Sequence, residues 1–224
     1  MPLAIFDIDG TLVDSRRIIS RSMDMAFEAE GLPAPGYEVT RTIVGMSLKL
    51  AIDKIAPRGV DAGGLDRLAA AYTDAYIELR KNPETQAPLY DGAYALLETL
   101  KAQGWQMGVA TGKSRKGLDI VLEMKNLTPF FGAHYCADDG PSKPDPFMVE
   151  ANLNALSCPP QEAVMIGDTS FDILMGINAS VTTLGVDWGF HTRKELEGCG
   201  ANRVLSTMEG LGGALMQFAE QGRL

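Results

Sequence analysis

Short apolar runs alternate with helical patterns along most of this 224-residue sequence, and this alternation restricts the folds open to it. The apolar runs predict strands at Leu3–Ile8, Trp105–Ala110, Ala133–Ala137, Ala163–Ile166, Thr182–Val186 and Arg203–Leu205. Helical periodicity between them predicts helices at Ala93–Gln103, Arg115–Lys125, Pro146–Leu156, Asp172–Ala179, Thr192–Gly198 and Met208–Gln221. Buried strands that alternate with helices favour a mainly parallel sheet covered on both faces. The predicted fold class is therefore α/β.

One stretch near the N-terminus interrupts this alternation. From about residue 15 to residue 79 the sequence shows helical periods and no convincing strand. These periods predict helices over Arg16–Glu30, Met46–Ala56 and Leu65–Arg80. Residues 82–88, NPETQAP, are polar and proline-rich, which predicts a linker that returns to the sheet. We therefore expect a sheet domain made of residues 1–14 and 82–224, with a helical insertion at 15–81.

The composition restricts the partners and the compartment of the protein. The formal net charge of −9 argues against a general binder of nucleic acid or of membrane surfaces. No apolar run approaches the roughly 20 residues of a membrane-spanning helix. The segment MPLAIFDIDG has only a short apolar run and no positive charge before it, so it does not predict a secretory leader. The three widely spaced cysteines predict neither a zinc site nor a disulfide framework. A reducing cytoplasm fits these features best, and the oligomeric state stays open.

Two acidic clusters directly follow predicted strands. FDIDGT carries Asp7 and Asp9, which share a strand face because they are two residues apart, and MIGDTSFD carries Asp168 and Asp172. The carboxyl ends of parallel strands meet at one edge of the sheet, so the four carboxylates should converge there. Clustered carboxylates need a cation or a shared proton, and hard oxygen ligands suit Mg²⁺. For each cluster alone, an Asp-Gly turn or a helix cap is the structural alternative.

The segment GVATGKS, residues 108–114, resembles the end of a phosphate-binding P-loop, G-x-x-x-x-G-K-[ST]. The pattern requires a glycine five residues before Gly112, and that position is occupied by Met107. We therefore do not predict a P-loop. Thr111 and Gly112 nevertheless follow a predicted strand, where a hydroxyl and an amide can donate to a phosphate. The structural alternative is an ordinary turn from strand to helix.

Two further residues complete the candidate site. Gly10 allows the backbone to turn sharply and to approach a ligand closely. Lys143, in PSKPDP, lies in a loop between a predicted strand and a predicted helix. A lone loop lysine is usually solvated, so its significance depends on the other motifs.

In this order the motifs resemble those of the haloacid dehalogenase-like superfamily of phosphotransferases. The matching residues are Asp7, Asp9 and Thr11 (D-x-D-x-T), Thr111, Lys143, and Gly167, Asp168 and Asp172 (GD-x-x-x-D). The phrases DIDGTLVDS, TGKSRKGLD and SKPDP resemble the phosphoglycolate phosphatase-like branch. The resemblance implies a Rossmann-like catalytic core and a small helical cap at residues 15–81.

The resemblance also implies a chemistry. Asp7 would attack phosphorus and form an aspartyl-phosphate, which divides one hydrolysis into two displacements. Asp9 would be the general acid for the leaving alcohol and then the base for water. Lys143 would neutralise both the nucleophile and the phosphate. The substrate would be a small phosphorylated metabolite, such as a phosphoglycolate-like monoester.

The resemblance assigns the remaining contacts as follows. Mg²⁺ would be held by Asp7, the backbone carbonyl of Asp9, Asp168 and Asp172, the last directly or through water. The phosphoryl group would be bound by Gly10, Thr111, Gly112 and Lys143.

Several alternatives remain open from the sequence. A phosphomutase of the β-phosphoglucomutase type shares these residues, and a pyrophosphatase or a nucleotidase is also possible. A non-catalytic Mg²⁺-binding interaction module is the alternative outside enzymes, but none of the expected catalytic residues is missing. Specificity should come from the helical insertion, where Arg41 or Lys49 could meet a substrate carboxylate. An ordinary loop and helix face is the alternative for that segment.

Overall fold

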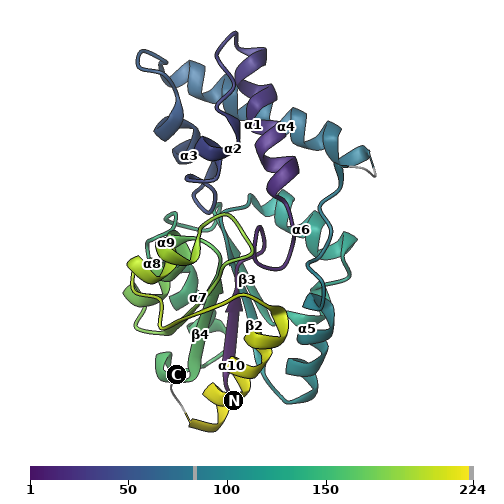
Figure 1. Cartoon of the computed structure of the whole chain (residues 1–224), viewed down its shortest axis with the longest axis vertical. Helices are drawn as coiled ribbons and strands as arrows, with labels where there is room; N and C mark the ends of the chain where they lie inside the picture. Colours follow the sequence, from purple (N-terminus) through teal and green to yellow (C-terminus); the bar gives the residue numbers. More distant parts are fainter. Residues whose placement is uncertain (83–84, 222–224) are drawn as a thin grey trace.

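A computed structural model describes residues 1–82 and 85–221, and it contains one parallel sheet of six strands in the order β3-β2-β1-β4-β5-β6 (Figure 1). The strands are β1 (Leu3–Phe6), β2 (Gln106–Thr111), β3 (Ala133–Cys136), β4 (Ala163–Gly167), β5 (Thr182–Val186) and β6 (Arg203–Leu205). β1 lies at the centre, where Phe6 is paired with Val109 of β2 and with Ile166 of β4. The predicted α/β class with a Rossmann-like parallel sheet is confirmed.

Helices cover both faces of the sheet, as the alternating pattern predicts. The sheet helices are α5 (Ala93–Ala102), α6 (Arg115–Met124), α7 (Phe147–Ala155), α8 (Ser170–Asn178), α9 (Arg193–Gly198) and α10 (Met208–Gln221). Ala4 and Phe6 of β1 belong to the apolar cluster that includes α5, α6 and α10. Leu3 and Ile5 belong to the cluster on the other face, with α7 and α8. Successive side chains of β1 therefore bury against opposite helical layers.

In the described part of the chain, the elements between β1 and α5 are all helices, and they lie beyond the carboxyl ends of the strands, at the top of Figure 1. We call residues 16–81 the helical insertion. Its helices are α1 (Arg16–Ala29), α2 (Gly36–Thr40), α3 (Leu48–Ile55) and α4 (Ala62–Lys81). It has an apolar cluster of its own, which includes Met23, Phe27 and Leu68. An insertion with its own core can close over the ends of the strands as a unit.

The structure changes some details of the insertion. The short helix α2 was not expected from the sequence, and α3 begins at Leu48, two residues later than predicted. The expected linker at 82–88 includes residues 83–84, which lie outside the described residues. The division into a core of 1–14 and 82–224 and a cap of 15–81 stays a prediction. None of the helices in the described part of the chain is long and apolar enough to cross a membrane.

Candidate active site

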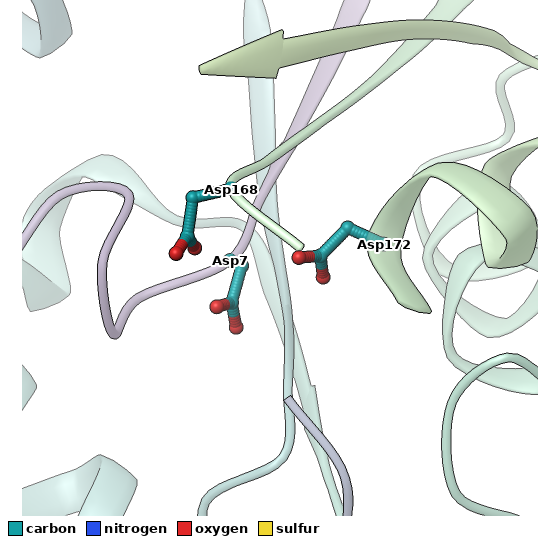
Figure 2. Close-up of side chains that lie close together, drawn as sticks. All are labelled: Asp7, Asp168 and Asp172. Carbon is teal, nitrogen blue, oxygen red and sulfur yellow. The ribbon is translucent and has the colours of Figure 1, made fainter. Parts of the chain in front are cut away.

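Three buried carboxyl groups meet at the carboxyl end of the sheet (Figure 2). Asp7 follows β1, Asp168 follows β4, and Asp172 lies in the first turn of α8. One oxygen atom from each of the three lies within 4.8 Å of the others. None of the three side chains is more than 2% exposed. The structure thus brings together the three predicted metal ligands that are side chains. For Asp9 the predicted ligand is the backbone carbonyl, and its carboxyl group faces a different partner.

Asp168 is fixed in orientation by two donors. The hydroxyl of Thr11 donates to Asp168 Oδ1 over 2.9 Å, and the backbone N–H of Phe190 donates to Oδ2 over 2.7 Å. Gly10, at φ +81°, passes so close that a Cβ atom there would lie 2.1 Å from Asp168 Oδ2. The glycine of the first motif is therefore required both by its backbone conformation and by the space that Asp168 occupies.

Lys143 is buried, so the solvated-loop alternative for this lysine is wrong. Its side chain is fully buried, and Nζ donates to Asp7 Oδ1 over 2.9 Å and to Asp172 Oδ1 over 2.6 Å. The other oxygen of Asp172 accepts from the backbone N–H and the hydroxyl of Thr169, over 3.0 and 2.7 Å. The N-cap of α8 is Thr169 and not Asp168, as the structural alternative had it, and Asp172 completes the capping box and binds the lysine as well.

Burial and neighbouring carboxylates raise the pKa values of two of the three carboxyl groups. Burial raises the pKa of Asp7 to about 6; Asp172 and Asp9 push it the same way, and Lys143 opposes them. Burial also raises the pKa of Asp168 well above its ordinary value, with further contributions from Asp172 and Asp7. Burial alone would lower the pKa of Lys143, but its two carboxylate neighbours outweigh this and raise it. One ammonium group does not compensate three carboxylates, so the site favours a further cation.

The carboxyl group of Asp9 is paired with Lys113, a contact that the sequence did not predict. Lys113 Nζ lies 2.7 Å from Asp9 Oδ2, and both side chains are largely buried. Asp9 Oδ1 is buried without a hydrogen-bond partner in the described part of the chain. Lys113 also lies over the ring of Tyr76 from α4, with 5.3 Å between Nζ and the ring centroid. Asp9, the predicted acid–base residue, thus has one carboxyl oxygen paired with Lys113 and the other without a hydrogen-bond partner among the described residues.

Thr111 and Gly112 lie where the sequence predicts, at the end of β2 and next to β1. Thr111 is buried, and its hydroxyl accepts from the backbone N–H of Lys113 over 3.4 Å. A Cβ atom on Gly112 would lie 2.6 Å from the carbonyl oxygen of Gly45 and 2.8 Å from that of Met46. The insertion therefore rests directly on Gly112, and only glycine permits so close an approach of the two backbones.

Arg41 and Lys49, the two candidates for a contact with a substrate carboxylate, both have protein partners. Arg41 is bonded to both carboxyl oxygens of Glu195 over 3.1–3.2 Å and to the carbonyl oxygen of Phe190 over 3.2 Å. Lys49 is exposed and pairs with Asp66 over 2.6 Å. Arg41 thus connects the insertion to the sheet domain, and Lys49 belongs to an ordinary helix face. The hydrogen bonds from Arg41 lower the pKa of Glu195 to about 2, which keeps this pair charged at neutral pH.

Replacing Arg41 by Gln is expected to lower kcat/KM by about two- to fivefold, the size of one partly exposed ion pair. The reason is that the insertion loses a charged contact that holds it closed over the site. Steady-state kinetics at low salt would measure the change. Arg67→Gln is the matched control, because Arg67 pairs with Glu30 inside the insertion. Equal losses in both variants would contradict a role for Arg41 in closure.

Comparison with known proteins agrees with this geometry. The model of the family described as haloacid dehalogenase-like hydrolase matches residues 4–186, which include Asp7, Lys143 and the pair Asp168 and Asp172. The chain belongs to this family. It is 31% identical over 216 residues to "Probable phosphatase IndB" of Dickeya dadantii, covering 95% of this chain and 93% of that protein. The family expected from the sequence is thereby confirmed, and the chain is a hydrolase of phosphatase type.

Other relatives within the haloacid dehalogenase-like family differ in their stated activities. The chain is 29% identical over 211 residues to "Pyrophosphatase PpaX" of Bacillus velezensis, covering 92% of this chain and 93% of that protein. The crystal structure of a hydrolase from Pseudomonas syringae superposes with a TM-score of 0.86 at 27% identity, covering 97% and 99% of the two chains. The family resemblance therefore establishes the fold and the reaction type more firmly than the substrate.

Proposed function

We propose that this protein is a Mg²⁺-dependent phosphatase that hydrolyses a small phosphate monoester through an aspartyl-phosphate on Asp7. The observation that carries the proposal is the buried Lys143, which bonds both Asp7 and Asp172 beside Asp168. A buried lysine that holds a carboxylate at the end of the central strand fits a site in which an anionic nucleophile must approach an anionic phosphate. A structural ion pair alone would not require a third carboxylate within reach.

The residues divide the reaction into two displacements. An oxygen of Asp7 forms a bond to phosphorus while the bond to the leaving-group oxygen breaks, and Asp9 donates a proton to that oxygen. Asp9 then removes a proton from water, whose oxygen attacks the same phosphorus and releases Asp7 and inorganic phosphate. Lys143, the hydroxyl of Thr111 and the backbone amides of Gly10 and Gly112 would hold the phosphoryl oxygens through both steps.

The donor set of this site fits Mg²⁺. Asp7, Asp168 and Asp172 supply hard oxygen atoms within 4.8 Å of one another, and the ammonium group of Lys143 is bonded to two of these three carboxyl groups. These three residues, with the backbone carbonyl of Asp9, would hold the ion. When bound, the ion would offset repulsion between nucleophile and phosphate and stabilise charge on the phosphoryl oxygens.

Excess chelator is expected to stop phosphate release, and added Mg²⁺ is expected to restore it.

The same site predicts that Mg²⁺ binding depends on pH, because a carboxyl group with a raised pKa keeps its proton to higher pH. Since Asp7 has a pKa of about 6, protons should compete with the ion below that pH. Thermal melts should show a larger increase in Tm from Mg²⁺ at about pH 7.5 than at about pH 5. Full activity in chelator, or an equal increase at both pH values, would contradict the assignment.

A pyrophosphatase is the second candidate, because PpaX is among the relatives. Release of inorganic phosphate from a panel of monoesters and from pyrophosphate separates the two. A phosphomutase would release little phosphate and would require a bisphosphate activator. The phosphoglycolate-like substrate, the cytoplasmic location and the absence of nucleic-acid or membrane partners stay predictions.

A further inference from the structure

A cavity of about 220 Å³ lies between the helical insertion and the sheet domain, and Asp9 forms part of its wall. The insertion contributes residues of α1, the loop before α3, and α4, while the sheet domain contributes Gly112–Ile120. In the proposed reaction Asp9 transfers a proton to or from the leaving-group oxygen. A cavity bounded by Asp9 and Gly112 is therefore the space that the leaving group would enter.

The wall of this cavity is mostly apolar. Met23 and Ile43 are buried, and Ile77 and Ile120 are partly buried. Tyr76 stacks on Tyr72 of the same helix, with ring centroids 6.1 Å apart. Polarizable sulfur, branched carbon and aromatic rings form a surface that favours apolar ligands. The uncharged polar groups of the wall are few, namely the hydroxyls of Tyr72, Thr73, Tyr76 and Ser114, so most of the surface of a polar leaving group would meet carbon.

The charged side chains of the wall do not change this conclusion. Lys113 is paired with Asp9 at 2.7 Å, so it is not free to bind a substrate carboxylate. Lys116 is exposed and Arg80 is half-buried, so solvent reaches both side chains. The interior therefore presents one neutralised ion pair and a largely hydrocarbon surface.

We propose that this cavity selects phosphate monoesters of an apolar alcohol about the size of one aromatic ring. This inference rests on the proposed phosphatase activity and names its substrate class. A cavity of about 150 Å³ lined by apolar side chains holds benzene, whereas sites for drug-sized ligands measure roughly 300–1,000 Å³. The volume of about 220 Å³ lies between these sizes and fits one ring with a short substituent. Pyrophosphate and 2-phosphoglycolate would leave the apolar wall unused.

The test compares benzyl phosphate with 2-hydroxyethyl phosphate and 2-phosphoglycolate. The first two are esters of primary alcohols of similar basicity, so a difference between them reports the cavity and not the leaving-group chemistry. The kcat/KM for benzyl phosphate is expected to exceed that for 2-hydroxyethyl phosphate by at least about tenfold, chiefly through KM. Equal values for these two, or a preference for 2-phosphoglycolate, would overturn the inference while leaving the phosphatase proposal intact.

A variant locates the effect in the cavity. Ile77 lines the cavity but belongs to none of the apolar clusters of the described residues, so Ile77→Asp should leave the insertion folded. This substitution should raise KM for benzyl phosphate about tenfold and change that for 2-hydroxyethyl phosphate much less. Ile177→Asp is the matched control, because Ile177 is 41% exposed on α8. An unchanged KM for benzyl phosphate in Ile77→Asp would show that the apolar group does not bind in this cavity.

Calorimetric titration with phosphonates, which cannot be hydrolysed, separates the two proposals. Benzylphosphonate should bind at least about tenfold more tightly than 2-hydroxyethylphosphonate, whether or not any ester turns over. Tight benzylphosphonate binding without phosphate release from any ester would overturn the phosphatase proposal but support the apolar site. Equal binding of both phosphonates would overturn the apolar site.

Discussion

Replacing Asp7 by Asn is expected to lower turnover of any phosphate monoester by at least about 10³-fold, because an amide oxygen does not form the covalent intermediate. The protein should stay folded. Asn keeps the shape of the side chain and an oxygen that can accept from Lys143, and it removes a buried charge whose pKa is raised to about 6. Phosphate release and thermal melts would be measured together.

Asp53→Asn is the control for this variant, because Asp53 is an exposed residue of α3 outside the site. Its turnover should equal that of the wild type. An Asp7→Asn protein that keeps wild-type turnover would show that another group attacks phosphorus. A loss of turnover with a collapsed Tm would instead assign Asp7 a role in folding.

Replacing Lys143 by Met is expected to lower kcat/KM by at least about 10²-fold, the effect of losing a buried donor to the reacting oxygens. The substitution also leaves Asp7 and Asp172 without their shared cation, so part of the loss could reflect stability. Measuring turnover well below the Tm of the variant, with saturating Mg²⁺, separates the two effects.

Lys113→Met is the matched variant, because Lys113 is also a largely buried lysine with a carboxylate partner. It should lower kcat/KM by about tenfold, since Asp9 loses the group that holds one of its oxygens. A larger loss in Lys113→Met than in Lys143→Met would point back to the GKS segment as the principal phosphate contact.

The sheet and its catalytic edge could be predicted from local sequence because each depends on short-range patterns. Apolar runs of four to six residues mark strands that are buried on both faces, as the structure confirms for β1, β2 and β4. The polar residues that follow these strands must then meet at one edge of a parallel sheet. Asp7, Asp168 and Asp172 therefore lie together although they are far apart in sequence.

The missed features depend on long-range packing. The bond of Arg41 to Glu195 joins residues 154 positions apart, and no periodicity records it. Helix α2 has only five residues and one buried side chain, Thr40, so it gives almost no periodic signal. The pair of Asp9 and Lys113 is only weakly indicated by the sequence, because Asp9 follows β1 and Lys113 follows the adjacent strand β2. A lysine side chain is long and flexible, so its position after a strand does not predict which carboxylate it binds.

The most direct test of the account is to identify the residue that carries the phosphoryl group during turnover. p-Nitrophenyl phosphate has a leaving group that needs little help from an acid, so the Asp9→Asn variant should still form the intermediate but hydrolyse it slowly. Acid quenching followed by peptide mapping should then place one phosphoryl group on Asp7. A phosphoryl group on any other residue, or equal phosphorylation of a protein that also carries Asp7→Asn, would contradict the central claim.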